Sequence, residues 1–279
     1  MILVTGASGT VGGAVAAALR ERGAPVMAAT SRAEELRADQ RRLDFADPAT
    51  FAPAFAGVRA LFLMLPPALP RARERFRALL SVARNEGVRR VAFLSIRNAD
   101  RLPMLPHRGL ERVVEASGLG WTHLRANDFM QNFATVPVYR DGIRRGELVG
   151  PGGRSRTAYV DVRDIGEATA RILAGGGHEG RAYTLTGPDP LTLAQVAAAL
   201  TATLDHPVAA RTPSLPGFFR HARRVGAPAP LALVMTSIGL IARLGLAAGV
   251  DPTLERLLAR RPRDIRDFAE SYSAAWASS

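Results

Sequence analysis

The stretch VTGASGTVGGAVAAAL, residues 4–19, joins an apolar run to a helical pattern through Gly6, Gly9 and Gly12. Glycines at such a turn allow backbone conformations closed to other residues, let a pyrophosphate approach the amides and permit close helix–strand packing. The helix that follows offers free amides and the positive end of its dipole to an anion. The turn lies between a predicted strand and a predicted helix, so we expect it to bind a dinucleotide. A tight turn without a ligand is the structural alternative.

The alternation begun by this turn continues over the first 125 residues. Apolar runs at 2–5, 25–30, 60–65, 90–95 and 121–125 predict strands, and amphipathic patterns at 11–22, 71–87 and 107–117 predict helices. Continuous apolar strands separated by helices are typical of a parallel sheet covered on both faces. We therefore predict an α/β fold, a Rossmann-type doubly wound parallel sheet with a smaller C-terminal substrate lobe.

The regular alternation of predicted strands and helices ends after residue 126. Later strands are predicted at 157–162, 181–187 and 207–212, with helices at 163–174 and 192–204. We expect residues 1–155 to form the cofactor-binding Rossmann domain, with contributions from elements in 156–212, and residues 213–279 to form a mainly helical substrate-binding lobe. The apolar stretch 231–250 contains Arg243 and three glycines, which favours a buried or lid-forming helical pair over a membrane span.

Composition excludes several classes of function. The 279 residues contain no cysteine, which removes disulfides, thiolate nucleophiles and cysteine-ligated metals and fits a reducing compartment. No secretory signal pattern is visible, so we expect a cytoplasmic protein. The net charge is +12 and every basic residue is arginine, but the arginines are scattered among acids, which favours a solvated surface or phosphate-bearing small ligands over nucleic acid. The histidines show no metal-ligand spacing, and we predict no metal site.

The end of the second predicted strand bears on the choice of cofactor. A cofactor without a 2′-phosphate usually meets an acid there, whereas arginine can pair with the phosphate of NADP. Ser31 and Arg32 therefore favour NADP(H) over NAD(H). The alternative is a solvated arginine paired with Glu34 or Glu35. Farther on, Asp44 and Phe45 stand where a third strand could meet the adenine.

Several motifs together resemble the NmrA-like group of atypical short-chain dehydrogenase/reductases, over nearly the whole chain. They include TGASGTVG (5–12), LDFADPATF (43–51), HRGLERVVEASGLGWTHLRANDFMQNF (107–133) and VDVRDIGEATARIL (160–173). The resemblance implies an NADP(H)-binding Rossmann domain with a small lobe closing over the nicotinamide. It assigns the pyrophosphate to the turn, the 2′ position to Ser31 and Arg32, the adenine to Asp44 and Phe45, and the cofactor wall to Leu65 and Pro66. The turn residues are Gly6, Ser8, Gly9, Thr10, Val11 and Gly12.

The chain has no lysine, which excludes the tyrosine–lysine proton relay of typical short-chain dehydrogenases. Hydride transfer needs mainly a bound nicotinamide and an aligned acceptor, so the missing relay points to electron-poor acceptors. Ser95, at the carboxyl end of a strand, and His107, at the start of a helix, are the candidate catalytic residues. They could equally be a strand end and a helix cap. Residues 125–133 suit a flat organic substrate or a structural turn; the candidate substrate-binding residues are Asn127, Phe129, Met130, Gln131 and Asn132.

These observations lead to one main hypothesis and two alternatives. The main hypothesis is an NADP(H)-dependent reductase of an activated C=C, C=N or quinone group in a small organic molecule of secondary metabolism. The proton would come from water, Ser95 or His107. The alternatives are a non-catalytic NADP-sensing regulator with a protein partner, and a non-redox cyclase or isomerase on the same fold. None of the three requires nucleic acid or a membrane.

Overall fold

A computed structural model of the chain describes residues 1–32, 36–66, 69–102 and 105–277. The chain forms two compact units. The first comprises residues 1–126, 162–185 and 256–259, and the second comprises residues 127–161, 186–255 and those from 260 on. The boundaries of these units differ from those of the expected domains, residues 1–155 and 213–279. The second unit begins at Asn127, within the range expected for the first domain.

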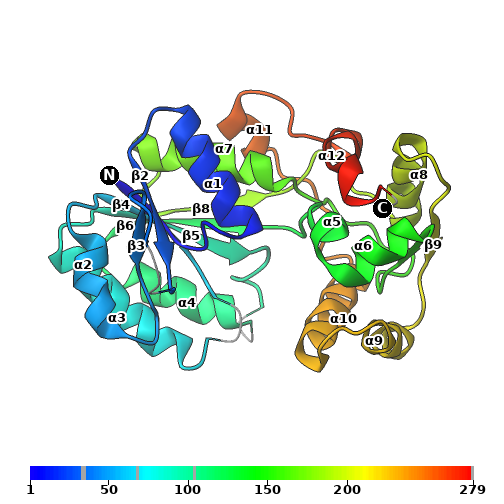
Figure 1. Cartoon of the computed structure of the whole chain (residues 1–279), viewed down its shortest axis with the longest axis horizontal. Coiled ribbons are helices and arrows are strands. Elements are labelled where there is room, and N and C mark those ends of the chain that lie inside the picture. The colour runs from blue at the N-terminus through cyan, green and yellow to red at the C-terminus, as the bar shows by residue number, and fades with distance from the viewer. Residues whose placement is uncertain (33–35, 67–68, 103–104, 278–279) are drawn as a thin grey trace. The chain divides into compact units, whose positions relative to one another are not determined.

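The first unit is built on a parallel sheet of seven strands in the order β3-β2-β1-β4-β5-β6-β8. The chain moves outward from β1 to β3, returns to β4 on the other side of β1, and continues outward to β8 (Figure 1). This confirms the predicted α/β class with a doubly wound parallel sheet. The strands are β1 (Ile2–Val4), β2 (Val26–Thr30), β3 (Gln40–Arg42), β4 (Ala60–Met64), β5 (Arg90–Ile96), β6 (Gly120–Ala126) and β8 (Arg181–Leu185).

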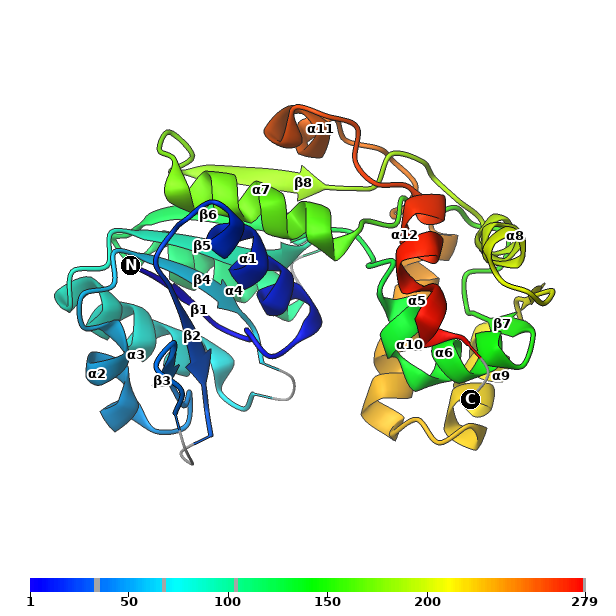
Figure 2. The same cartoon turned by 45° about the horizontal axis from the view of Figure 1, so that its top comes forward.

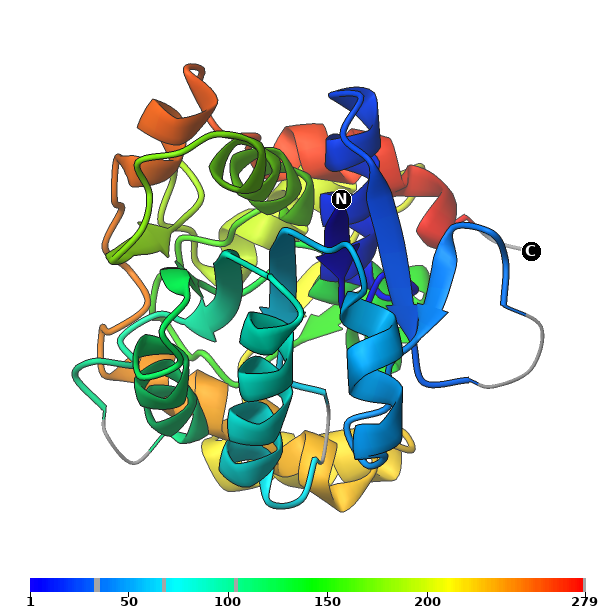
Figure 3. The same ribbon diagram turned by 90° about the vertical axis from the view of Figure 1, so that its left-hand side faces the viewer.

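Helices cover both faces of this sheet. On one face α1 (Thr10–Glu21) packs along α7 (Val162–Ala174), where Gly166 lies against the backbone of Ala14 (Figure 2). The other face carries α2 (Phe51–Phe55), α3 (Ala72–Asn85) and α4 (Pro106–Glu115), which lie side by side (Figure 3). A sheet buried on both faces explains why its central strands are apolar throughout rather than alternating.

The core under α3 and α4 follows from helical periodicity. In α3 the buried residues are Phe76, Leu79, Leu80 and Ala83, which recur at the spacing of one helix face. Phe76 meets Phe93 of β5 edge to face, with ring centroids 5.8 Å apart. The opposite face of α3 is thereby left to solvent.

The second unit combines a two-stranded parallel sheet with helices. Its strands are β7 (Glu147–Val149) and β9 (Ala209–Arg211). Trp276 is fully buried near the C-terminus, and its indole Nε1 donates to the Phe133 carbonyl at 3.2 Å. The helices are α5 (Asn132–Thr135), α6 (Pro137–Arg144), α8 (Leu193–Thr203), α9 (Leu215–Arg224), α10 (Ala229–Arg243) and α12 (Ile265–Tyr272); α11 (Thr253–Leu258) has residues in both units.

Most predicted elements exist, and the exceptions are informative. The strand expected at 157–162 is wrong: Thr157 and Val160 form only isolated bridges, and α7 begins at Val162. The segment 231–250 holds one helix, α10, which ends at Arg243, instead of a helical pair. Among the helices described, none is both long and apolar enough to cross a membrane.

Candidate functional site

The turn after β1 shows why glycine is needed at two of its positions. Gly6 has a φ of +65°, and a Cβ there would overlap Met64 Sδ. A Cβ on Gly12 would overlap the carbonyl oxygen of Gly6 and press on that of Thr5. Thr5 fixes the strand beneath, because its hydroxyl donates to the Phe62 carbonyl and accepts from the Met64 amide, both at 3.0 Å. The glycines therefore allow helix α1 to start directly against β1.

The first turn of α1 is open to a ligand. Gly9 occupies the N-cap position, no side chain caps the helix, and its first turn carries no acid. Ser8, Gly9 and Thr10 are exposed, whereas Val11 and Gly12 are buried beneath them. The first amides of a helix have no partner within it. Free amides, the positive dipole end and the absence of a capping side chain and of acids make a cradle that fits a pyrophosphate.

This turn lies at the point where the strand order reverses. β1 pairs with β2 on one side and with β4 on the other. In open α/β sheets the crevice for a ligand forms at this switch point, beyond the carboxyl ends of the strands. The expected pyrophosphate-binding residues thus stand where the fold places a cofactor.

The other predicted cofactor residues follow the neighbouring strands. Ser31 and Arg32 are exposed just beyond β2, and Arg32 has no ion pair among residues with described positions. Its alternative partners Glu34 and Glu35 lie outside the described residues. Leu65 and Pro66 follow β4 and are half-buried.

Asp44 and Phe45 lie beyond β3, but both have structural contacts there. An oxygen of the Asp44 carboxylate accepts from the Ala46 amide at 2.8 Å. The ring of Phe45 packs on Phe76, with centroids 5.6 Å apart. Both residues are only partly buried, so a face of each is accessible.

Ser95 lies inside a charged cluster between β5, β6 and α4. Ser95 is 1% exposed, and its hydroxyl donates to Glu111 Oε1 at 2.7 Å. Arg125, the register partner of Ser95 on β6, donates to both oxygens of Glu111 at 2.9 Å. Arg108 donates to Glu111 and to Glu115, at 3.0 and 2.9 Å. The cluster ties the middle of α4, through Glu111, to β5 and β6, and the hydroxyl of Ser95 takes part in it.

The arginines keep Glu111 ionised although it is fully buried. Burial alone would raise the pKa of this carboxyl, but the hydrogen bonds from Arg125 and Ser95 outweigh it and lower the pKa. Glu111, Arg108 and Arg125 did not figure among the expected site residues. The i,i+3 spacing of Arg108 and Glu111 on a helix, next to a strand bearing an arginine, is the signal that could have found them.

His107 is on the first turn of α4 but does not cap it. The N-cap residue is Leu105, and His107 Nδ1 is buried without a hydrogen-bond partner in the part of the chain that the structure describes. Burial lowers the pKa of His107, and the charge of Glu111 opposes this shift. The direction is the one expected from the sequence, although burial is its main cause. Among the described residues no hydrogen bond joins Ser95 to His107. Ser95 is hydrogen-bonded to Glu111, whereas Glu111 acts on His107 through its charge.

Glu111, Glu115 and His123 could be mistaken for a metal site. One ligand atom of each lies within 4.8 Å of the others. Both carboxylates, however, already accept from guanidinium groups of Arg108 or Arg125. A divalent cation would have to displace two arginines, so this group is a network of ion pairs.

The predicted substrate residues divide into buried and accessible ones. Asn127 donates to the carbonyls of Ala158 and Ala247, both at 2.9 Å, and Gln131 donates to Asp161 at 2.9 Å. Met130 is 1% exposed. These three side chains hold the second unit together, whereas Phe129 and Asn132 are partly exposed.

Asp128, between them, was absent from the expected site. Its carboxylate accepts from the Asn132 side chain at 2.7 Å and from the Phe129 amide at 3.0 Å. It lines a cavity of about 30 Å³ with Tyr139 and Tyr159. Burial raises the pKa of Asp128 to about 6, since the two hydrogen bonds only partly offset it. Burial also raises the pKa values of Tyr139 and Tyr159, so neither hydroxyl is activated as a base.

Comparison with known proteins gives consistent results. Residues 1–242 match the NmrA-like family. The chain is 32% identical over 287 residues to the NAD(P)H azoreductase of Xenophilus azovorans, covering 99% of each chain. It is 30% identical over 293 residues to the (4-alkanoyl-5-oxo-2,5-dihydrofuran-3-yl)methyl phosphate reductase of Streptomyces griseus subsp. griseus, again covering 99% of each. The structure of Escherichia coli NADPH-dependent quinone oxidoreductase QOR2 with NADPH superposes with a TM-score of 0.85 at 26% identity, over 99% of this chain and 100% of that one.

Proposed function

Because this chain belongs to the NmrA-like family, we propose that it is an NADP(H)-dependent reductase of an activated C=C, C=N or quinone group in a small organic molecule. Proteins similar to it over their full length are named as reductases of azo and furanone compounds, and a similar structure is a quinone oxidoreductase. Azo, dihydrofuranone and quinone groups all contain a polar double bond that can accept hydride.

The observation that carries the proposal is the open first turn of α1. It is exposed, uncapped and free of acids, and two glycines hold it against β1 at the switch point of the sheet. Such a turn favours a dinucleotide pyrophosphate over any uncharged ligand. A bound nicotinamide cofactor would supply the hydride.

The preference for NADP(H) rests on Arg32. It stands just beyond β2, where the adenosine ribose is read in this fold, and its side chain is exposed. A guanidinium forms paired hydrogen bonds with a phosphate, so Arg32 would favour the cofactor with the 2′-phosphate.

The chain's own residues then position the acceptor and its proton. His107 is neutral near pH 7, and its Nδ1 has no hydrogen-bond partner among the described residues. We assign it the hydrogen bond to the acceptor or to the water that protonates the product. Ser95 serves as a positioning residue, because its hydroxyl holds Glu111 and thereby helix α4, which carries His107. Phe129 and Asn132 would contribute an apolar wall and an amide to the acceptor pocket.

The test is cofactor titration followed by turnover. We expect NADPH to bind more tightly than NADH, and absorbance of the reduced cofactor to fall with at least one of a panel of quinones, enones, iminium ions and azo compounds. NADPH binding without oxidation by any of these would overturn the proposal in favour of the sensor or the non-redox enzyme. Failure of both NADPH and NADH to bind would refute the assignment of the glycine turn to the pyrophosphate.

Two variants separate the roles of His107 and Ser95. His107→Ala is expected to lower kcat by up to about 100-fold, with NADPH affinity unchanged, because it removes an acid–base group. Ser95→Ala should lower kcat less and also reduce stability, and kcat should recover in Ser95→Thr, which keeps the hydroxyl. Equal kcat in wild type and His107→Ala would leave water as the proton source.

A further inference from the structure

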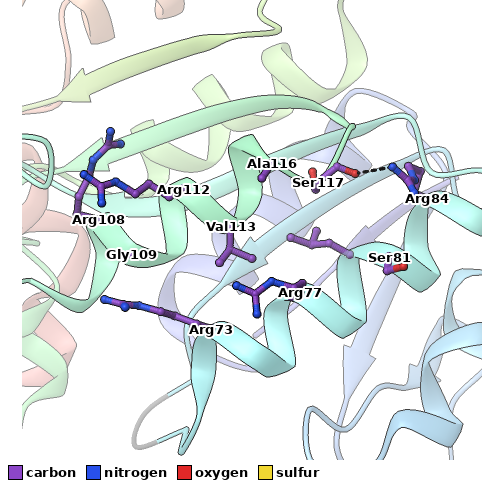
Figure 4. Close-up of a pocket in the computed structure, with 11 residues that line it drawn as sticks. Arg73, Arg77, Ser81, Arg84, Arg108, Gly109, Arg112, Val113, Ala116 and Ser117 are labelled. Atoms are coloured by element: carbon purple, nitrogen blue, oxygen red, sulfur yellow. Dashed lines mark hydrogen bonds between the residues drawn. The ribbon is translucent and has the colours of Figure 1, made fainter.

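A groove lined by five arginines runs between α3 and α4 in the first unit. Its volume is about 460 Å³. Arg73, Arg77 and Arg84 come from α3, and Arg108 and Arg112 come from α4 (Figure 4). We call it the arginine groove. No acidic side chain lines it in the part of the chain that the structure describes.

The helical repeat brings these arginines together. Residues 73, 77 and 84 recur at spacings of four and seven, and residues 108 and 112 at four, so each set forms a row along one helix face. Each helix buries its apolar side against the sheet, through Phe76 and Leu80 in α3 and Val113 in α4. Two rows of arginines therefore border one groove. Arginines four residues apart are separated by about 6 Å along the helix axis, and Arg77 and Arg84 by about 10 Å.

Most of this charge is not neutralised by the protein. Arg73, Arg77 and Arg112 are exposed and have no ion pair with any residue of known placement. Arg84 donates to the Ser117 carbonyl at 3.4 Å, and only Arg108 is paired with acids. Like charges facing one another are unfavourable unless an anion lies between them.

Gly109 of α4 lines the groove and makes room for Arg73. Glycine inside a helix is less favourable than alanine. A Cβ at this position would overlap the guanidinium of Arg73, which lies over the glycine backbone. The missing side chain lets an arginine of α3 reach across to α4, which narrows the space between the two rows.

The chemistry of the groove selects the kind of anion. Guanidinium groups bind phosphate oxygens in pairs, and linked phosphates can engage arginines of both rows at once. Single-stranded nucleic acid is usually held by aromatic side chains on which bases stack, and no aromatic residue lines the groove among those described. We propose that the arginine groove binds an oligophosphate, a compound with two or more linked phosphate groups.

This site is separate from the glycine turn. The turn precedes α1, which packs with α7 on one face of the sheet, whereas α3 and α4 cover the other face. Ligands at the two sites therefore meet different residues, and each site can be disabled alone.

Calorimetric titration with tripolyphosphate, ATP and orthophosphate tests the proposal. We expect tripolyphosphate to bind more tightly than orthophosphate, and Arg77→Ala/Arg112→Ala to weaken it by about tenfold or more through the loss of two charge-assisted contacts. Arg77→Lys/Arg112→Lys, which keeps the charge but not the forked geometry, should fall in between. Tighter binding of ATP than of tripolyphosphate would identify a nucleotide as the source of the phosphates.

Arg22→Ala/Arg89→Ala is the matched control, because it removes the same charge from exposed arginines of the same unit. It should change tripolyphosphate affinity by less than about twofold, and NADPH affinity should be equal in all variants. An equal loss of tripolyphosphate affinity in both double variants would show that binding depends only on net charge and would overturn the proposal. So would absence of tripolyphosphate binding, or tighter binding of an oligothymidylate that is lost in Arg77→Ala/Arg112→Ala.

Discussion

At the carboxyl edge of the sheet, the turn after β1 and the cluster after β5 present their polar groups in opposite states. The turn exposes Ser8, Gly9 and Thr10 and leaves the first amides of α1 uncapped. The cluster buries Ser95 and Glu111 and satisfies them with arginines. A ligand site keeps its donors free for the ligand, whereas a structural network uses them within the protein. Catalytic-looking residue types alone do not distinguish the two.

The second unit adds a third case. Asp128 is a carboxylate with hydrogen bonds from an amide group and a backbone N–H but without an arginine, and its pKa is raised to about 6. Glu111, with two arginines, has a lowered pKa. Burial acts on both in the same direction, so the neighbouring cations decide which carboxyl can hold a proton near neutral pH.

Glu111→Ala should produce the largest effect. It removes the buried carboxylate that Arg108 and Arg125 share, leaving Arg108 with Glu115 and Arg125 with Asp100. We expect the free energy of unfolding to fall by about 3–5 kcal/mol in denaturant titrations at pH 7. Since the pKa of Glu111 is lowered in the folded state, its contribution is complete above its ordinary pKa of 4.5 and is lost as the pH falls through the folded value. Glu74→Ala, which breaks an exposed pair, should cost less than about 1 kcal/mol. A similar loss of unfolding free energy in Glu111→Ala and Glu74→Ala would show that the cluster does not stabilise the fold.

Gly12→Ala should damage the open turn. The added Cβ would force α1 away from the carbonyl of Gly6, a form of overpacking that costs about 1–3 kcal/mol. NADPH affinity, measured by titration, should fall by about tenfold or more. Gly13→Ala is the control, because its Cβ would lie 3.4 Å from the nearest backbone oxygen, that of Ala7. Unchanged NADPH affinity in Gly12→Ala would separate cofactor binding from this turn.

Asp128→Asn should stabilise the protein at alkaline pH. The folded pKa of about 6 exceeds the ordinary 3.8, so the folded state loses stability as the pH rises from about 4 through 6. The amide keeps an acceptor for Asn132 and Phe129 without the buried charge. We expect a gain of about 1–3 kcal/mol at pH 8 and no gain at pH 4, from urea unfolding at both. A variant less stable at pH 8 than wild type would contradict the assignment.

Arg32→Ala should have the smallest effect, confined to cofactor choice. Loss of one exposed arginine–phosphate contact should lower NADPH affinity by about tenfold and change NADH affinity by less than about twofold. Arg22→Ala, at another exposed arginine of the first unit, should change neither. Equal weakening of both cofactors by Arg32→Ala would remove the basis for the NADP(H) preference.

Much of the fold could be predicted from local patterns. Apolar runs and amphipathic periods depend only on nearby residues, and β1, β2, β4, β5, β6 and β8 lie at predicted positions. Residues 157–162 misled the prediction because a short apolar run suits a strand, whereas here Thr157 and Val160 make single bridges to different partners and only Val162 belongs to a regular element, helix α7. β9 was expected, but its pairing with β7 in a separate sheet could not be read from the sequence.

The sequence by itself determined the doubly wound sheet, the glycine turn and the absence of a tyrosine–lysine relay, because each depends on neighbouring residues or on composition. Only the tertiary structure decided that Ser95 is hydrogen-bonded to Glu111, that Asp128 is paired with amide groups and no cation among the described residues, and that five arginines line one groove. These features join residues distant in the chain. Burial and charge pairing, which set the pKa and the availability of a side chain, arise only when those residues meet.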